Sequence, residues 1–313
     1  MGFLLILLLA AQDPARSHLE RGAAHLKKNE IPQAIAELKR ALALEPRAAD
    51  AHFLLGQAYL AEGSLPFLAE ARAELQQALD LKPALFWARF YLAKTYIDLG
   101  RLDKARAELE QALASKPGMP HILALLGEVH RKLGAPEKAI ELNRTALEAD
   151  ASMNAAHYHI ALALLDLHKP DEAEQALRRA LESRFVIPEM YVALGAIRLD
   201  RGDLAGAEKL FRQAAALAPE RPEARIKLAQ ALRRRGDYRA AQAELKAAFP
   251  EGKAFPGTAY YQRLRADAQV ELGRIFEAQG RSAQAGEAFA RALDLDPDHP
   301  EAAGLIAAPP PRQ

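Results

Sequence analysis

The chain has 313 residues, of which 50% are hydrophobic and only 6% are aromatic, a composition that suits many small helix contacts better than one large core. Its 42 basic and 41 acidic residues give a formal net charge of +1, so charge offers no reason to expect nucleic acid or an anionic membrane as the partner. The absence of cysteine excludes disulfides and lipid attachment at a cysteine.

The N-terminus opens with an unbroken apolar run over residues 3–11, followed by Gln12-Asp13-Pro14. A run of this length is too short for the ~20 residues that span a bilayer, but it matches the apolar region of a secretory signal. We therefore predict a signal peptide at residues 1–11, a mature chain without a membrane span, and export to the periplasm or the outside. The N-terminal sequence of the mature protein would check this expectation.

Between about residues 15 and 300, one pattern of small and apolar residues recurs about every 34 residues, eight times. A small residue marks the first predicted helix of each copy, at Gly22, Gly56, Ala93, Gly127, Ala161, Gly195, Ala229 and Gly273. Two alanines seven residues apart mark the second helix; the pairs begin at Ala34, Ala71, Ala105, Ala139, Ala173, Ala207, Ala241 and Ala285. Small side chains at these places let two helices cross closely. The period predicts stacked helix-turn-helix repeats that start near residues 15, 49, 86, 120, 154, 188, 222 and 266.

Glycine and proline punctuate the copies. A glycine ends the first helix in six copies, at Gly63, Gly100, Gly134, Gly202, Gly236 and Gly280, because glycine accepts the left-handed conformation that turns the chain back. A proline closes five copies, at Pro46, Pro83, Pro117, Pro219 and Pro297.

Two insertions interrupt this regularity. Three extra residues lie around Ser64, and ten extra residues precede the eighth copy, within residues 249–257. We predict a loop there, with helix resuming near Thr258. Its aromatic residues either cover the last helices or form a contact element. Residues 301–313 are expected to be a cap remnant followed by a disordered tail.

Motifs that carry chemistry are missing from the sequence. It contains no phosphate-binding glycine loop, no nucleophile elbow and no paired zinc histidines. His157 and His159 are two residues apart in a predicted helix and point to different faces. Asn143 begins a glycosylation sequence that lies in the middle of a helix. We therefore predict no enzyme activity, no catalytic residue, no cofactor and no metal site.

Beyond the face that packs within each repeat, the first helices carry a second stripe of residues at spacings of four and then three. Its apolar members, with Trp87 beside them, are Phe53, Leu60, Trp87, Phe90, Ile97, Tyr158, Leu162, Leu165, Val192 and Leu199. Two arginines of the seventh copy, Arg233 and Arg234, are candidates to bind carboxylates of a partner, unless the charge run is simply a solvated face.

The copies resemble the tetratricopeptide repeat family. The slots that carry the resemblance are Leu55, Gly56, Tyr59, Ala71, Ala78 and Pro83 in the second copy. The resemblance implies an all-α fold, an α-solenoid or superhelix of about eight helix-turn-helix repeats. It also implies that the second stripe lines a concave groove that binds other proteins. The alternative is that several of these side chains pack against neighbouring first helices.

The sequence therefore predicts a non-enzymatic protein–protein interaction scaffold that binds a peptide or helix of unknown identity in its groove. A second reading makes the chain a constitutive helical subunit of an envelope enzyme or of a secretion or assembly complex. Size-exclusion of the native protein would separate the two, because an obligate subunit should rarely appear alone.

Overall fold

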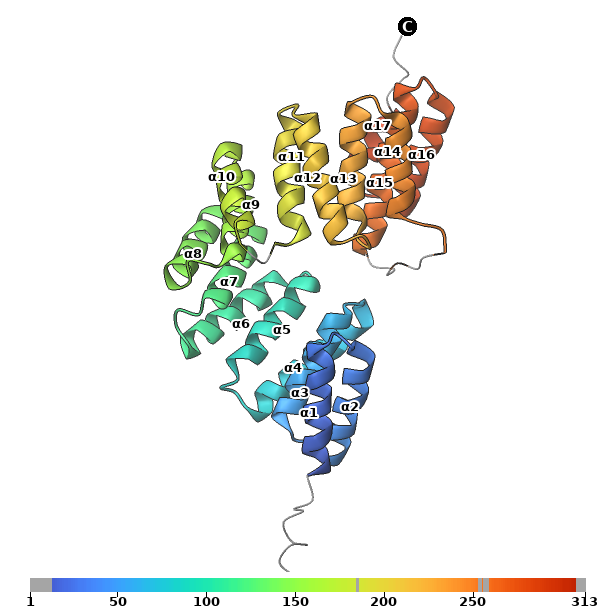
Figure 1. The fold of residues 1–313 in the computed structure, drawn as a ribbon. Coiled ribbons are helices and arrows are strands. Elements are labelled where there is room, and N and C mark those ends of the chain that lie inside the picture. The colour runs from blue at the N-terminus through green and yellow to red at the C-terminus, as the bar shows by residue number, and fades with distance from the viewer. Residues whose placement is uncertain (1–12, 184–185, 253–254, 256–258, 308–313) are drawn as a thin grey trace, which may run out of the picture. The chain divides into compact units, whose positions relative to one another are not determined.

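A computed structural model describes residues 13–183, 186–252, 255 and 259–307, and this part of the chain contains seventeen α-helices and no β-strand (Figure 1). The predicted signal peptide at residues 1–11 and the tail from residue 308 lie outside the described residues. The chain forms two compact units, Met1–Ala163 and Leu164–Gln313. The predicted fold class, an all-α solenoid of helix-turn-helix repeats, is confirmed.

The first unit holds four complete helix pairs and most of a ninth helix. The pairs are α1 (Pro14–Lys27) with α2 (Ile31–Leu44), α3 (Ala49–Glu62) with α4 (Leu65–Leu81), α5 (Phe86–Asp98) with α6 (Leu102–Ser115), and α7 (Pro120–Lys132) with α8 (Pro136–Ala149). The helices of each pair pack mainly on each other, and α2, α4 and α6 also pack on the next first helix. The boundary between the units falls within α9 (Asn154–Asp166).

The second unit continues the same order and ends with a short helix. It contains α10 (Pro170–Leu181), α11 (Pro188–Asp200), α12 (Leu204–Leu217), α13 (Pro222–Arg234), α14 (Tyr238–Ala248), α15 (Ala259–Ala278), α16 (Ser282–Leu295) and α17 (Ala302–Ala307). The last long pair departs from the pattern, because α15 begins at Ala259, ahead of the repeat start predicted near residue 266. Residues 253–254 and 256–258 of the insertion lie outside the described residues.

Residues in the left-handed backbone conformation turn the chain between the helices of each pair. Gly63 has a φ of 77°, and its N–H donates to the carbonyl of Tyr59. The two repeats that lack a glycine at this place use Asn29 and His168, with φ of 58° and 56°. Asparagine and histidine are among the side chains that tolerate this conformation best. The glycine pattern in the sequence therefore marks a conformational requirement of the turn.

The alanine pairs form the crossing points of the helices. All sixteen alanines, from Ala34 and Ala41 to Ala285 and Ala292, are at most 3% exposed. The small residue of each first helix faces a larger side chain of the second. A Cβ added to Gly195 would lie 2.6 Å from Cε1 of Phe211, whereas the next repeat has Ala229 and Leu245 at the equivalent positions, in the same core cluster. Glycine faces the two phenylalanines Phe211 and Phe289, but it also faces Leu38, Leu75 and Asn143 in other repeats, and each of these contacts leaves no room for a Cβ.

Repeat four carries a polar exception at this core position. Asn143 on α8 is fully buried, and its Nδ2 donates to the carbonyl of Ala139 at 2.8 Å. The glycosylation sequence that begins at Asn143 is therefore closed to modification in the folded chain, as the position within a helix indicated.

A recurring contact between a basic side chain and a glutamate joins the two helices in four repeats. The N–O distances are 2.8 Å for His18–Glu37, 2.6 Å for His52–Glu74, 2.8 Å for Arg89–Glu108 and 2.9 Å for Arg225–Glu244. The two members are 19 residues apart, or 22 in the repeat with three extra residues. A basic side chain of the first helix thus meets a glutamate at one fixed position of the second.

Glu37 makes the chain sensitive to acid. Its hydrogen bond with His18, together with bonds from Arg21 and Arg40, lowers the pKa of Glu37 from 4.5 to about 2. Between those pH values the unfolded chain binds a proton that the folded chain does not, so this contribution to stability is present above pH 4.5 and disappears as the pH falls toward about 2. We expect Glu37→Gln to weaken the acid dependence of unfolding, measured as urea midpoints of both proteins across this range. Superimposable pH profiles would contradict the assignment.

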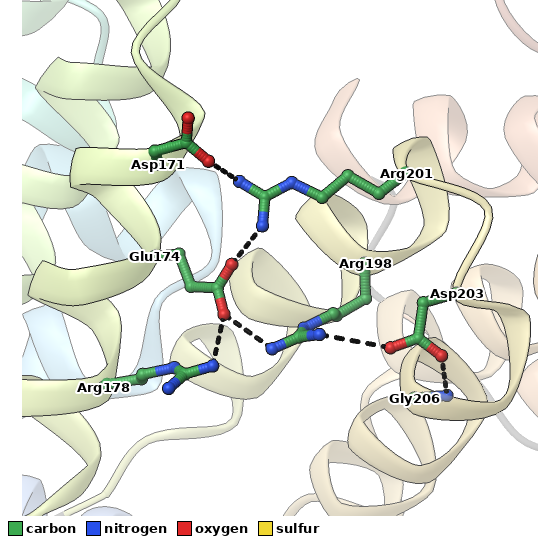
Figure 2. A network of polar contacts seen from close by, with 7 residues as sticks. All are labelled: Asp171, Glu174, Arg178, Arg198, Arg201, Asp203 and Gly206. Atoms are coloured by element: carbon green, nitrogen blue, oxygen red, sulfur yellow. Dashed lines mark hydrogen bonds and ion pairs between the residues drawn. The ribbon is translucent and has the colours of Figure 1, made fainter.

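A network of arginines around Glu174 ties α10 to the following repeat (Figure 2). Glu174 accepts hydrogen bonds from Arg178 at 2.7 Å, from Arg198 at 2.6 Å and from Arg201. Arg201 also bonds Asp171, and Arg198 bonds Asp203, whose carboxylate accepts the Gly206 N–H at the start of α12. The side chain of Glu174 is only 9% exposed. Arg178 of α10 and Arg198 of α11 balance its charge.

The same arrangement recurs one repeat later. Glu208 on α12 pairs with Arg212 at 2.8 Å and with Arg235, which begins the next turn. In both cases the arginines lie four and 27 residues after the glutamate, and Glu174 and Glu208 are 34 residues apart. We call these two clusters the glutamate clasps. Each fastens the second helix of one repeat to the repeat that follows.

Candidate binding faces of the first helices

Aromatic side chains form a continuous row across α3, α5 and α7 of the first unit. We define this aromatic face by Phe53, Phe86, Trp87, Phe90, Tyr91 and His121. Phe53 meets Tyr91 edge to face with ring centroids 5.7 Å apart, and Tyr91 meets Phe90 at 5.4 Å. Trp87 then contacts Phe90 at 5.4 Å and His121 at 6.4 Å. These are the separations at which aromatic pairs attract.

The aromatic face is partly buried and partly open. Phe53, Phe90 and Ile97 pack against the buried core of α4–α7, and Leu60 packs against the core of α2–α4. Burial also raises the pKa of Tyr91. Each of these side chains is half-buried. The rings pack on neighbouring first helices and still present an outer edge to solvent.

On α9 the stripe continues with Tyr158, Leu162 and Leu165, all half-buried. The ring of Tyr158 contacts His159 with centroids 5.7 Å apart. Burial lowers the pKa of His159, which keeps this imidazole neutral near neutral pH. In the described part of the chain, no group of three His, Asp or Glu side chains is placed to hold a metal ion.

In the second unit, the first helices α11, α13 and α15 enclose a pocket of about 290 Å³, which we call the first-helix pocket. It is lined by Val192, Glu223, Ile226, Lys227, Gln230, Leu264, Asp267, Val270, Glu271, Arg274, His299 and Glu301. Its apolar floor comes from Val192, Ile226 and Val270, which lie at equivalent places of three successive repeats. The stripe of the first helices therefore borders a real cavity in this unit.

Most charges around the first-helix pocket are paired within the chain. Arg274 bonds Glu301 at 2.6 Å, and His299 bonds Asp267 at 3.0 Å. Glu223 differs, because burial raises its pKa and its covered Oε2 has no hydrogen-bond partner among the described residues.

The remaining candidate residues pack or form hydrogen bonds within the second unit. Leu199 is 3% exposed and belongs to the core, while Val192 is half-buried at the pocket. Arg233 donates to Glu271 on α15, and Arg234 donates to the carbonyl of Leu199 at 2.7 Å. The sequence predicted that these arginines either bind carboxylates of a partner or belong to a charged, solvated helix face. Instead, these arginines already bond within the second unit.

Sequence reasoning named Lys227 and Arg274 among its candidate cations but missed the apolar pocket residues of the last two repeats. Ile226 and Gln230 follow the same spacing as Phe53 and Gln57, and Val270 with Arg274 repeats it once more. Extending the stripe by two repeats would have found them. Glu223 gave no comparable signal, because its burial depends on α11 and α15 together.

Family comparisons agree with the repeat geometry. Models described as tetratricopeptide repeat or TPR repeat match residues 22–63, 67–118, 90–154, 158–222, 198–268 and 266–299. The chain belongs to the tetratricopeptide repeat family. A search of curated proteins found no match for this tetratricopeptide repeat chain.

Solved tetratricopeptide repeat structures share the fold at low identity. A tetratricopeptide repeat protein from Parabacteroides merdae is 20% identical, with a TM-score of 0.58 and coverage of 82% of this chain and 97% of its own. A thermophilic TPR protein of Thermus thermophilus is 25% identical, with a TM-score of 0.53 and coverage of 59% and 99%. Pseudomonas aeruginosa PilF is 21% identical, with a TM-score of 0.53 and coverage of 71% and 97%.

Tetratricopeptide repeat folds act in general as scaffolds for protein interaction. Among the described helices, none has the length and apolar character needed to cross a membrane.

Proposed function

We propose that this tetratricopeptide repeat protein is a non-enzymatic interaction scaffold whose first helices bind a peptide or helix through apolar anchors. The observation that carries the proposal is the unbroken row of ring contacts from Phe53 on α3 to His121 on α7. Such a row presents a large, rigid apolar edge with little side-chain entropy to lose on binding.

The surroundings of the aromatic face favour a peptide that combines apolar and acidic residues. Lys94 lies with its Nζ 5.9 Å from the centroid of Tyr91, and its side chain is exposed. An apolar anchor between the rings would therefore place a neighbouring carboxylate within reach of an ammonium group.

Trp87 provides the sharpest test. We expect Trp87→Ala to weaken binding of peptides selected on the full chain from a display library by tenfold or more, about 1.4 kcal/mol. Calorimetric titration of the selected peptide into each variant would measure the change. Leu44→Ala is the matched control, because Leu44 is a 55% exposed apolar residue on the second helix α2.

Circular dichroism would show that both variants keep their helices. Equal affinity of wild type and Trp87→Ala, with a loss confined to Leu44→Ala, would reject the first helices as the binding surface.

A further inference from the structure

A second cavity, unrelated to the first-helix faces, lies between α14, α15 and α16. It has a volume of about 380 Å³, and we call it the clasp-position pocket. It is lined by Gln242, Leu245, Lys246, Phe249, Arg265, Ala268, Gln269, Leu272 and Leu295. Five of these side chains, Leu245, Phe249, Ala268, Leu272 and Leu295, are apolar. The cavity therefore combines an apolar floor with two cations and two amides.

No carboxylate lines the clasp-position pocket, although two cations do. Arg265 lies over two adjacent rings, with its guanidinium carbon 5.7 Å from the centroid of Phe249 and 5.9 Å from that of Phe255. Within the described residues, Arg265 makes no ion pair. Lys246 pairs with Glu251 only at 3.7 Å, and the two side chains are 77% and 91% exposed, so solvent screens that pair.

In the two preceding repeats, a glutamate occupies the position that corresponds to Gln242 in this pocket. Gln242 lies 34 residues after Glu208 and 68 after Glu174, at the position that holds the acid of each glutamate clasp. Lys246 likewise follows Arg178 and Arg212 in the series. In the two clasps an internal glutamate neutralises the cations. In the seventh repeat Gln242 replaces the glutamate, and Gln279, before Gly280, stands where Arg201 and Arg235 precede Gly202 and Gly236. The pocket thus keeps Lys246 at its clasp position and gains Arg265 from a different position of the repeat, with no carboxylate in its lining.

Gln269 adds a polar group that has an unused hydrogen-bonding atom. Its Oε1 is covered and has no partner among the described residues. Turning the amide by half a rotation exchanges this oxygen for the Nε2 donor, because the two ends of a glutamine amide have nearly the same shape. A carboxylate in the pocket could then accept from Gln269 as well as from Arg265.

We propose that the clasp-position pocket binds a carboxylic acid with an apolar body. The carboxylate occupies the place that Glu174 and Glu208 occupy in their clasps and pairs with Arg265 and Lys246. The apolar body lies against Leu245, Leu272 and Leu295. A peptide C-terminus with an apolar last residue and a free apolar acid share this chemistry. The inference does not depend on the first-helix faces.

N-acetyl-L-phenylalanine is a suitable probe, because it joins a carboxylate to an aromatic body. We expect it to bind the full chain with a dissociation constant of about 1 mM or tighter, followed by NMR chemical-shift titration. N-acetyl-L-phenylalanine amide, which lacks the charge, should bind at least tenfold more weakly. Equal binding of acid and amide, or binding of neither, would overturn the proposal.

Two variants test whether the acid binds in this pocket or is only attracted to the positive charge of the protein surface. Arg265→Gln removes the cation over the rings and should weaken the acid tenfold or more. Gln242→Glu restores the internal acid of the other clasps and should exclude the ligand's carboxylate to the same extent while the chain keeps its fold. Arg239→Gln, on the same helix as Gln242 but outside the pocket, is the matched control and should leave binding unchanged.

Gln242→Glu keeps the test valid if Arg265→Gln fails to fold, because it adds a side chain of the same size. Undiminished binding to Gln242→Glu would overturn the proposal. A pentapeptide that ends in phenylalanine then identifies the source. Tighter binding than the free acid indicates a peptide C-terminus, and weaker binding indicates a free acid; both support the carboxylate site.

Discussion

Replacing Arg233 with alanine is expected to lower the free energy of unfolding by about 3–5 kcal/mol, because the change leaves a buried carboxylate without its partner. Arg233 on α13 is 19% exposed, and Glu271 on α15 is 5% exposed. Their ion pair links the seventh repeat to the eighth. Chemical denaturation of the two proteins would measure the loss.

The loss should depend on pH in a defined direction. Burial raises the pKa of Glu271 above 4.5 even with Arg233 beside it. Without Arg233 the pKa rises further, so the folded variant binds a proton that the unfolded chain releases. Stability of Arg233→Ala should therefore fall as the pH rises through that pKa and recover in acid.

Two further variants isolate the buried charge. Adding Glu271→Gln to Arg233→Ala should restore most of the stability at neutral pH, because an amide is easier to bury than a carboxylate. Arg239→Ala, at an exposed position on α14, should change stability by no more than about 0.5 kcal/mol. A small, pH-independent loss in Arg233→Ala would show that Arg233 is free for a partner, as the sequence suggested.

Gly195→Ala is expected to destabilise the chain by about 1–3 kcal/mol, although alanine is the better helix former. The added methyl group would lie 2.6 Å from Cε1 and 2.9 Å from Cδ1 of the fully buried Phe211. One of the two helices α11 and α12 must then move. Thermal and urea unfolding would measure the cost.

A second substitution should relieve the overlap. Together with Gly195→Ala, Phe211→Leu recreates the alanine–leucine pairing of Ala229 with Leu245 in the next repeat. We expect the double variant to be more stable than the sum of the single changes predicts, by about 0.5–3 kcal/mol. Gly286→Ala on α16, where an added Cβ meets nothing within 4 Å, should stabilise instead. Additive single changes would argue against the close crossing.

The repeats, their turns and their crossing points could be predicted because each depends on residue type at a fixed spacing. Gly63 predicts a turn in the left-handed conformation, and Ala34 with Ala41 predicts a close helix crossing. Neither prediction needs information from distant parts of the chain. The sequence could not reveal that Arg233 meets Glu271, since the two are 38 residues apart and the pair depends on how α13 packs on α15.

The first-helix pocket shows an intermediate case. Its apolar floor follows the stripe, so Ile226 and Val270 were within reach of the same pattern. The glutamate clasps also carried a visible signal, a glutamate with arginines four and 27 residues later, but only the structure shows that these arginines converge on one carboxylate. The missing acid at Gln242 has meaning only beside those clasps.

We expect a partner to bind along the first helices of the first unit. Trp87 is the only tryptophan of the chain, so its fluorescence reports on that face alone. Titration with a selected peptide that lacks tryptophan should shift the emission of Trp87 to shorter wavelength and saturate with the affinity measured by calorimetry. Full binding with unchanged Trp87 emission would contradict the account.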